Sequence, residues 1–123
     1  MRALVIDDSR AVRFIIAKIL DELGMEVLHA ANGLEGLEQL KQAPDVDLML
    51  VDWNMPEMNG LEFITAVRSR RAYDGVRILM VTSEAEGAQV ARALQAGADE
   101  YLMKPFTRDV LVAKLGLLDI LEE

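Results

Sequence analysis

The chain has 123 residues, a length that suits one domain and leaves no room for a second. Hydrophobic residues make up 52% of it and cysteine is absent, so a sizeable core is available while disulfide and thiol chemistry are excluded. Acidic residues outnumber basic ones by 21 to 13, and the formal charge of -8 disfavours binding to nucleic acid or to an anionic membrane.

Short apolar runs alternate with helical patterns along the whole chain. The runs predict five strands, over residues 3–6, 26–30, 47–51, 76–81 and 100–103. A helical pattern follows each strand, and each helix has a candidate N-cap: Ser9, Asn32, Asn59, Ser83 and Thr107. Three of these caps have a glutamate three residues later that completes a capping box: Glu35, Glu62 and Glu86. Gly24 and Gly97 are placed to stop the first and fourth helices.

Five strand-then-helix repeats predict right-handed crossovers and a parallel sheet covered on both faces. The expected fold class is α/β, a single doubly wound five-stranded parallel sheet with five helices, of the flavodoxin-like kind. For the strand order we adopt 2-1-3-4-5, one of the common orders of such sheets, without deriving it. Ligands of these folds bind outside the carboxyl ends of the strands, and in this order the first and third strands are neighbours.

Polar residues stand at the carboxyl ends of four predicted strands. They are Asp7, Asp8, Asp52, Thr82 and Lys104. Three carboxylates at one edge of a sheet raise one another's pKa values unless a cation lies among them. All the metal-donor atoms in this set are oxygens, which favours Mg²⁺ that keeps several waters and can accept a phosphate oxygen.

This set of residues can transfer a phosphoryl group. A carboxylate such as that of Asp52 can attack phosphorus to form an acyl phosphate, and catalysis then consists mainly of placing cations around the phosphoryl oxygens. Mg²⁺ and Lys104 would supply these cations, and the Thr82 hydroxyl can donate to a third oxygen. Singly, Asp7 and Asp8 also suit a helix start and Asp52 a turn, but the combination favours a site.

Four motifs in order along the chain resemble the response-regulator receiver family. They are Asp7-Asp8, Asp52-Trp53-Asn54-Met55-Pro56 with Gly60, Thr82-Ser83, and Lys104-Pro105-Phe106. The resemblance implies a receiver domain over residues 1–123 that takes a phosphoryl group from a histidine kinase onto Asp52. It also implies a cis peptide bond between Lys104 and Pro105.

The resemblance assigns the metal ligands. Asp8 and Asp52 are expected to bind Mg²⁺ directly and Asp7 through water, and the backbone carbonyl of Asn54 completes the set. Asn54 and Glu84, two residues after Asp52 and Thr82 respectively, match members with short-lived phosphorylation, so fairly fast self-dephosphorylation is expected.

Tyr101 matches the aromatic switch position of the family, whose ring turns inward when the threonine, here Thr82, moves toward the phosphoryl group. A half-buried tyrosine is also common in strands, so this role rests on the resemblance. The resemblance further implies a protein target on the face made by the fourth helix, fifth strand and fifth helix, and a chemotaxis pathway.

The last helix carries two apolar stripes. A core stripe consists of Leu111, Leu115 and Leu118, and a second stripe on another face consists of Val110, Ala113, Leu117 and Ile120. One interpretation of the second stripe is an apolar but solvent-exposed helix surface. The other is a contact surface for a partner or a homodimer, or the start of a coiled coil that continues past Glu123.

The longest apolar runs are far shorter than the ~20 residues of a membrane span and no signal-peptide pattern is present, so we expect a cytoplasmic protein without membrane insertion. The resemblance favours a stand-alone signalling module. One alternative is a receiver cut from a longer regulator, with an output domain after the last helix. A haloacid-dehalogenase-type phosphatase needs Asp-x-Asp after the first strand, where Asp7-Asp8-Ser9 stands. A flavodoxin-like cofactor carrier needs a phosphate-binding loop there, and these two acids would repel a phosphate.

Overall fold

The computed structural model describes residues 1–83 and 89–120 as one α/β unit built on a five-stranded parallel sheet. The strands are β1 (Arg2–Ile6), β2 (Glu26–Ala30), β3 (Leu48–Asp52), β4 (Arg77–Ser83) and β5 (Glu100–Lys104). The helices are α1 (Arg10–Glu22), α2 (Gly33–Gln42), α3 (Gly60–Arg68), α4 (Val90–Ala96) and α5 (Arg108–Leu117), with a short 3-10 helix η1 (Arg71–Tyr73). The order β2-β1-β3-β4-β5 confirms the predicted fold class and strand order.

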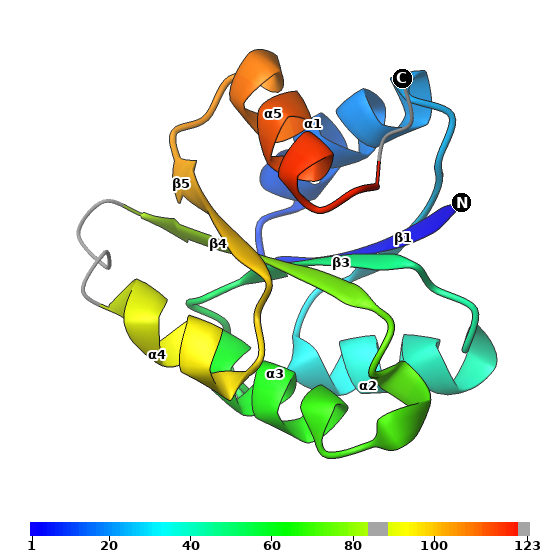
Figure 1. Ribbon diagram of the computed structural model, residues 1–123, viewed down its shortest axis with the longest axis vertical. Coiled ribbons are helices and arrows are strands. Elements are labelled where there is room, and N and C mark those ends of the chain that lie inside the picture. Colours follow the sequence, from blue (N-terminus) through cyan, green and yellow to red (C-terminus); the bar gives the residue numbers. More distant parts are fainter. Residues whose placement is uncertain (84–88, 121–123) are drawn as a thin grey trace.

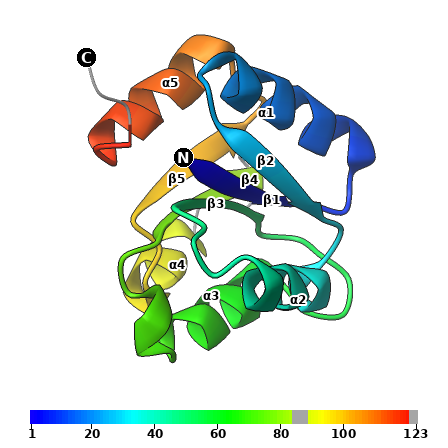
Figure 2. The same ribbon diagram turned by 90° about the vertical axis from the view of Figure 1, so that its right-hand side faces the viewer.

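Helices cover both faces of the sheet, with α1 and α5 on one side and α2, α3 and α4 on the other (Figures 1 and 2). Successive residues of β1 therefore enter two different cores. Leu4 and Ile6 pack under α2–α4 and Ala3 and Val5 under α1 and α5. The central strand β3 is buried along its whole length, which explains why it reads as a continuous apolar run.

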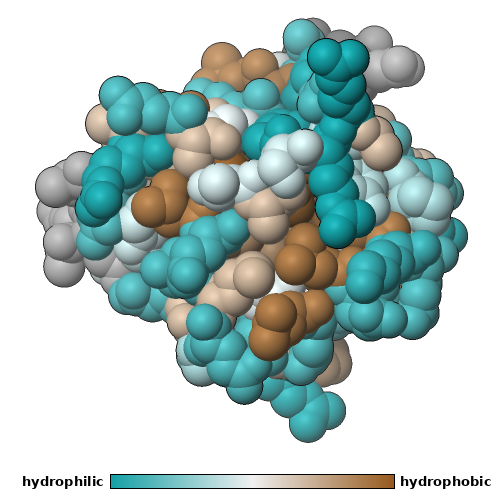
Figure 3. Space-filling model, turned by 90° about the horizontal axis from the view of Figure 1, so that it is seen from below, coloured by the Kyte–Doolittle hydropathy of each residue, from teal (hydrophilic) through white to brown (hydrophobic). Residues whose placement is uncertain are grey.

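The outer face of α2, α3 and α4 carries apolar side chains among hydrophilic ones (Figure 3). Within the described ranges, the structure contains no helix with the length and hydropathy that a bilayer crossing requires.

Most helix starts lie where the caps predict. The side chains of Ser9, Asn32, Asn59 and Thr107 each accept a hydrogen bond from the backbone N–H three residues later. Asn59 and Glu62 form a complete capping box, which sets the start of α3 close to the carboxyl end of β3.

The predicted start of the fourth helix is wrong. Ser83 is the last residue of β4, which continues beyond Val81, and α4 begins at Val90. The physical reason is tertiary: Thr82 and Ser83 lie beside Met103 and Lys104 of β5, so strand pairing holds them extended. Glu86, the expected partner in the capping box, lies outside the described residues.

The predicted second stripe of the last helix is also partly wrong. The helix α5 ends at Leu117, and Asp119 adopts a left-handed φ of 58°. The N–H of Ile120 then donates to the Leu115 carbonyl at 3.1 Å, the pattern of a Schellman C-cap. Ile120 is 7% exposed and packs in the core, so the outer stripe is reduced to Val110, Ala113 and Leu117, and among the described residues α5 does not extend beyond Leu117.

Arg68 at the end of α3 connects the segment that precedes β4 with the segment that precedes β5. Its Nε donates to the Gly97 carbonyl at 2.9 Å, and its Nη atoms donate to the carbonyls of Tyr73 at 2.8 Å and Val76 at 2.7 Å. A salt bridge of 2.9 Å to Asp99 completes the network. One guanidinium thus satisfies backbone groups that precede both β4 and β5.

We expect Arg68→Met to lower the free energy of unfolding by about 2–4 kcal/mol, because partly buried carbonyls and the Asp99 carboxylate lose their donor. Urea denaturation measures the change. Arg70→Met is the matched control, since Arg70 is an exposed arginine two residues away and should shift stability by less than about 0.5 kcal/mol. Equal effects of the two substitutions would contradict the role of Arg68.

Candidate functional site

Three sequence-predicted residues meet at the carboxyl edge of the sheet. Asp7 directly follows β1, Asp52 ends the neighbouring strand β3, and Lys104 ends β5. The Lys104 Nζ lies 3.2 Å from Asp7 Oδ2 and 3.1 Å from Asp52 Oδ1. The lysine therefore reaches over the end of β4 to contact both acids.

The three acids form a compact cluster. Carboxylate oxygens of Asp7, Asp8 and Asp52 all lie within 4.8 Å of one another. Asp7 and Asp52 are 2% and 5% exposed, whereas Asp8 is exposed and leaves one side of the cluster open to solvent. Asp7 is held in place because its Oδ1 accepts the Ser9 backbone N–H at 2.8 Å.

The electrostatics of this cluster show a shortage of positive charge. Burial raises the pKa of Asp52 to about 6; Asp7 and Asp8 add to the rise, and Lys104 opposes it. Burial by itself would lower the Lys104 pKa, but Asp52 and Asp7 outweigh it, so that pKa is raised and the lysine stays charged. One lysine does not balance three carboxylates, and the all-oxygen donor set fits an added hard divalent cation such as Mg²⁺.

Gly60 allows α3 to approach the end of β3. A Cβ atom at this position would lie 2.7 Å from the Asp52 carbonyl oxygen and 3.0 Å from the Trp53 Cα. The Gly60 N–H instead donates to the Trp53 carbonyl at 3.0 Å, and the Trp53 N–H donates to the Val81 carbonyl at 2.9 Å. These contacts fix the backbone directly after Asp52. Sequence reasoning noted Gly60 in a motif but missed this steric need.

The other proposed site residues lie on β4 and in the loops that follow β3 and β5. Thr82 is fully buried in β4, one residue beyond the register partner of Asp52, and its hydroxyl donates to the Ser83 carbonyl at 3.4 Å. Asn54 is exposed in the loop after β3, and the Lys104–Pro105 bond is cis. Glu84, the other residue tied to dephosphorylation rate, lies outside the described residues.

Tyr101 lies on β5, the strand at one edge of the sheet. Its ring centroid is 4.0 Å from the Lys114 Nζ, and that nitrogen also pairs with Glu100 Oε1 at 3.0 Å. The Tyr101 ring is half-buried against the core under α2–α4. No local sequence signal joins Lys114 to this strand, so the pairing could not be found without the tertiary structure.

Comparisons with known proteins agree with this geometry. The response regulator receiver domain family matches residues 3–116. A chemotaxis protein CheY homolog of Campylobacter jejuni is 47% identical over 116 residues, which cover 94% of this chain and 89% of that protein. The structure of Vibrio cholerae chemotaxis protein CheY4 superposes with a TM-score of 0.87 at 35% identity and covers 98% of both chains.

A two-component system response regulator/GGDEF domain protein superposes with a TM-score of 0.90 at 30% identity. The match covers 98% of this chain and 50% of that one, so the chain spans about half the length of this relative. With the family match, the CheY relatives and the acidic cluster taken together, the chain belongs to the response regulator receiver domain family.

Proposed function

We propose that the chain takes a phosphoryl group from a histidine kinase onto Asp52, with Mg²⁺ held by Asp7, Asp8 and Asp52. Receivers of the CheY type are phosphoacceptor signalling proteins rather than classical enzymes, and a two-component receiver implies a histidine kinase donor. The observation that supports Asp52 as the acceptor is its place among Asp7, Asp8 and Lys104, with a carboxylate oxygen 3.1 Å from the lysine nitrogen.

The side chains divide the chemistry among them. Asp52 is the nucleophile, because it contacts the lysine and its backbone is held by strand pairing and by the contacts at Gly60, whereas an oxygen of Asp7 is occupied by the Ser9 N–H. Lys104 offers an ammonium group beside Asp7 and Asp52 that can also contact a phosphoryl oxygen. Mg²⁺, when bound, neutralises charge on the phosphoryl oxygens. The exposed side of Asp8 leaves room for the donor to approach.

The response to phosphorylation is proposed to pass through Thr82 and Tyr101 to the face of α4, β5 and α5. On that face the exposed residues Val110, Ala113 and Leu117 are available to a protein target or to a second copy of the chain. Membership in a chemotaxis pathway is supported by the CheY relatives, and a place within a longer regulator by the GGDEF relative. Cytoplasmic location and fast self-dephosphorylation stay predictions.

Incubation with acetyl phosphate and Mg²⁺ tests the function. We expect intact mass spectrometry to show a gain of one phosphoryl group, removed by hydroxylamine because an acyl phosphate is cleaved by this nucleophile. The gain should disappear when EDTA removes the metal. A chain that gains no mass at millimolar acetyl phosphate and Mg²⁺ would contradict the proposed function.

Metal binding can be followed through Trp53, which is 5% exposed and directly follows Asp52. We expect Mg²⁺ to change Trp53 fluorescence, and Asp8→Asn to weaken the apparent affinity by about tenfold or more, because a charged ligand is lost. Asp21→Asn is the control, since it removes the same charge from an exposed site on α1. Unchanged affinity in Asp8→Asn would remove Asp8 from the metal site.

A further inference from the structure

Arg13 on α1 connects that helix with the chain just beyond β1. Its Nη1 donates a hydrogen bond to the backbone carbonyl of Asp7, which lies between the end of β1 and the N-cap Ser9. The Arg13 side chain is half-buried. The proposed function does not use Arg13, although this residue contacts the backbone of a proposed metal ligand.

The Arg13 guanidinium lies in this position although one of its nitrogens gains no partner. Among the residues that the structure describes, Arg13 Nε is the only buried side-chain nitrogen or oxygen without a hydrogen bond. A buried donor without a partner costs stability and needs an explanation. The bond from Nη1 to the Asp7 carbonyl provides one, because it fixes the direction of the side chain while Nε stays unpaired.

The two peptide groups beside Asp8 are both held in place. On one side, the Asp7 carbonyl accepts from Arg13, and the Asp7 N–H donates to the Ala30 carbonyl at 3.1 Å. On the other side, the Ser9 N–H donates to Asp7 Oδ1 at 2.8 Å. Since a peptide group is planar, a fixed carbonyl before Asp8 and a fixed N–H after it leave this residue little freedom.

The Asp8 carboxylate needs such a restraint. Asp8 is exposed, and repulsion from Asp7 and Asp52 favours turning its carboxylate toward solvent. An Asp8 oxygen nevertheless lies within 4.8 Å of oxygens of both other acids. The backbone conformation therefore keeps the carboxylate in the cluster, and Arg13 is the side chain that holds the peptide group before it.

We propose that Arg13 is a positioning residue for the metal site: by holding the Asp7 carbonyl, it directs the Asp8 carboxylate toward a Mg²⁺ ion shared by the three acids. This inference rests on the proposed function, because it concerns the same site. Charge alone predicts the opposite effect, since a guanidinium near the acids repels a divalent cation. The direction of the change in Mg²⁺ affinity therefore distinguishes positioning from electrostatics.

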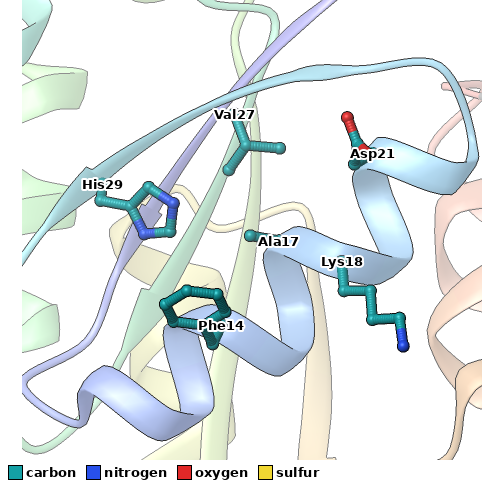
Figure 4. A pocket seen from close by; sticks show the side chains of 6 residues that line it. All are labelled: Phe14, Ala17, Lys18, Asp21, Val27 and His29. Atoms are coloured by element: carbon teal, nitrogen blue, oxygen red, sulfur yellow. The ribbon is translucent and has the colours of Figure 1, made fainter.

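A rival explanation is that Arg13 only holds α1 against β2. Burial, and after it the charge of Arg13, lowers the pKa of His29 on β2, so the guanidinium acts on this strand as well. His29 lines a hollow between α1 and β2 together with Phe14 (Figure 4). Every described residue that lines this hollow belongs to α1 or β2. Substitutions of His29 and Phe14 therefore perturb the contact between these two elements without removing an acid of the cluster.

The test is a Mg²⁺ titration followed by Trp53 fluorescence. We expect Arg13→Met to weaken the apparent affinity by about tenfold, and by no more than Asp8→Asn does, because a group that orients a metal ligand is lost. Arg13→Lys should recover most of the affinity, since an ammonium group of similar reach can donate to the carbonyl. Arg10→Met is the matched control: Arg10 is exposed on the same helix, and its loss should leave the affinity unchanged or slightly increase it.

A double-mutant cycle tests whether Arg13 acts through Asp8. In an Asp8→Asn background, Arg13→Met should change the affinity by less than about twofold, because the ligand that Arg13 positions is already lost. His29→Gln and Phe14→Ala should each leave the wild-type affinity within about twofold. Should circular dichroism show that Arg13→Met does not fold, Arg13→Gln replaces it, since the glutamine side chain ends where the arginine Nε lies, short of the Asp7 carbonyl.

The outcomes separate the two claims. If millimolar Mg²⁺ leaves the wild-type signal unchanged, or Asp8→Asn binds as well as the wild type, the proposed metal site fails and the inference fails with it. If Asp8→Asn weakens binding but Arg13→Met leaves the affinity unchanged or increases it, the inference is overturned and the proposed function stands. Additive losses in the double-mutant cycle, or an equal loss in His29→Gln, would also overturn the inference, because they would show a general effect on the fold.

Discussion

Asp52→Asn is expected to abolish the mass gain from acetyl phosphate completely. An amide oxygen is a poor nucleophile toward phosphorus, so the variant cannot form the acyl phosphate even though it keeps nearly the same shape. Neither Asp7 nor Asp8 is expected to replace it, because Asp7 is fixed by its bond to the Ser9 N–H and Asp8 lies in solvent. Intact mass spectrometry after incubation with donor and Mg²⁺ measures the loss.

The control for this experiment is Asp21→Asn, which changes an exposed aspartate on α1 in the same way and should be phosphorylated like the wild type. A phosphoryl gain that persists in Asp52→Asn would place the acceptor elsewhere. Trp53 fluorescence provides a second reading, because the signal that accompanies phosphorylation should vanish together with the mass gain.

The same substitution is expected to stabilise the metal-free chain. Its free energy of unfolding should rise by about 2–3 kcal/mol at pH 7.5, because the pKa of Asp52 is raised from 3.8 to about 6 in the folded chain. At that pH the ionised carboxylate is buried beside two other acids, and a neutral amide of the same shape avoids this cost. Urea denaturation in EDTA measures the difference.

The stability difference between Asp52→Asn and the wild type is expected to depend on pH, and the raised pKa of Asp52 fixes the direction. Between pH 3.8 and about 6 the folded chain keeps a proton on Asp52 that the unfolded chain has already released, so this residue lowers wild-type stability as the pH rises through that window. The advantage of Asp52→Asn should be fully present above pH 6 and should shrink toward zero near pH 4. If the stability gain of Asp52→Asn did not change with pH, packing and not the charge of Asp52 would be its cause.

Mg²⁺ should reverse part of this advantage. A cation that binds the folded wild type but not the unfolded chain adds stability in proportion to the logarithm of its concentration. Asp52→Asn loses one charged ligand and should gain less from the metal, so the two unfolding curves should approach each other as Mg²⁺ is added. Asp21→Asn should follow the wild type throughout. An unchanged gap at millimolar Mg²⁺ would argue against a metal ligand at Asp52.

Much of the fold could be predicted because its signals are local. The strand over 26–30 has the predicted bounds, and Ser9, Asn32, Asn59 and Thr107 cap helices as expected. A side-chain cap acts within three residues, and an apolar run marks a strand buried on both faces wherever it lies. The candidate site followed from one further rule, that the carboxyl ends of parallel strands share an edge.

Three features were decided by tertiary contacts. Pairing with β5 keeps Thr82 and Ser83 in β4, against their tendency to cap a helix. The left-handed turn at Asp119 returns Ile120 to the core, which helical periodicity alone would have placed outside. Burial raises the pKa of Asp52, and burial depends on the packing of the whole sheet.

The sequence by itself thus determined which acids and which lysine reach the edge of the sheet, because the strand ends follow from local patterns and the carboxyl ends of parallel strands share one edge. Only the folded chain decided that the Lys104 nitrogen lies 3.1 Å from Asp52, a residue 52 positions away. Such distances depend on sheet twist and helix packing, to which residues throughout the chain contribute.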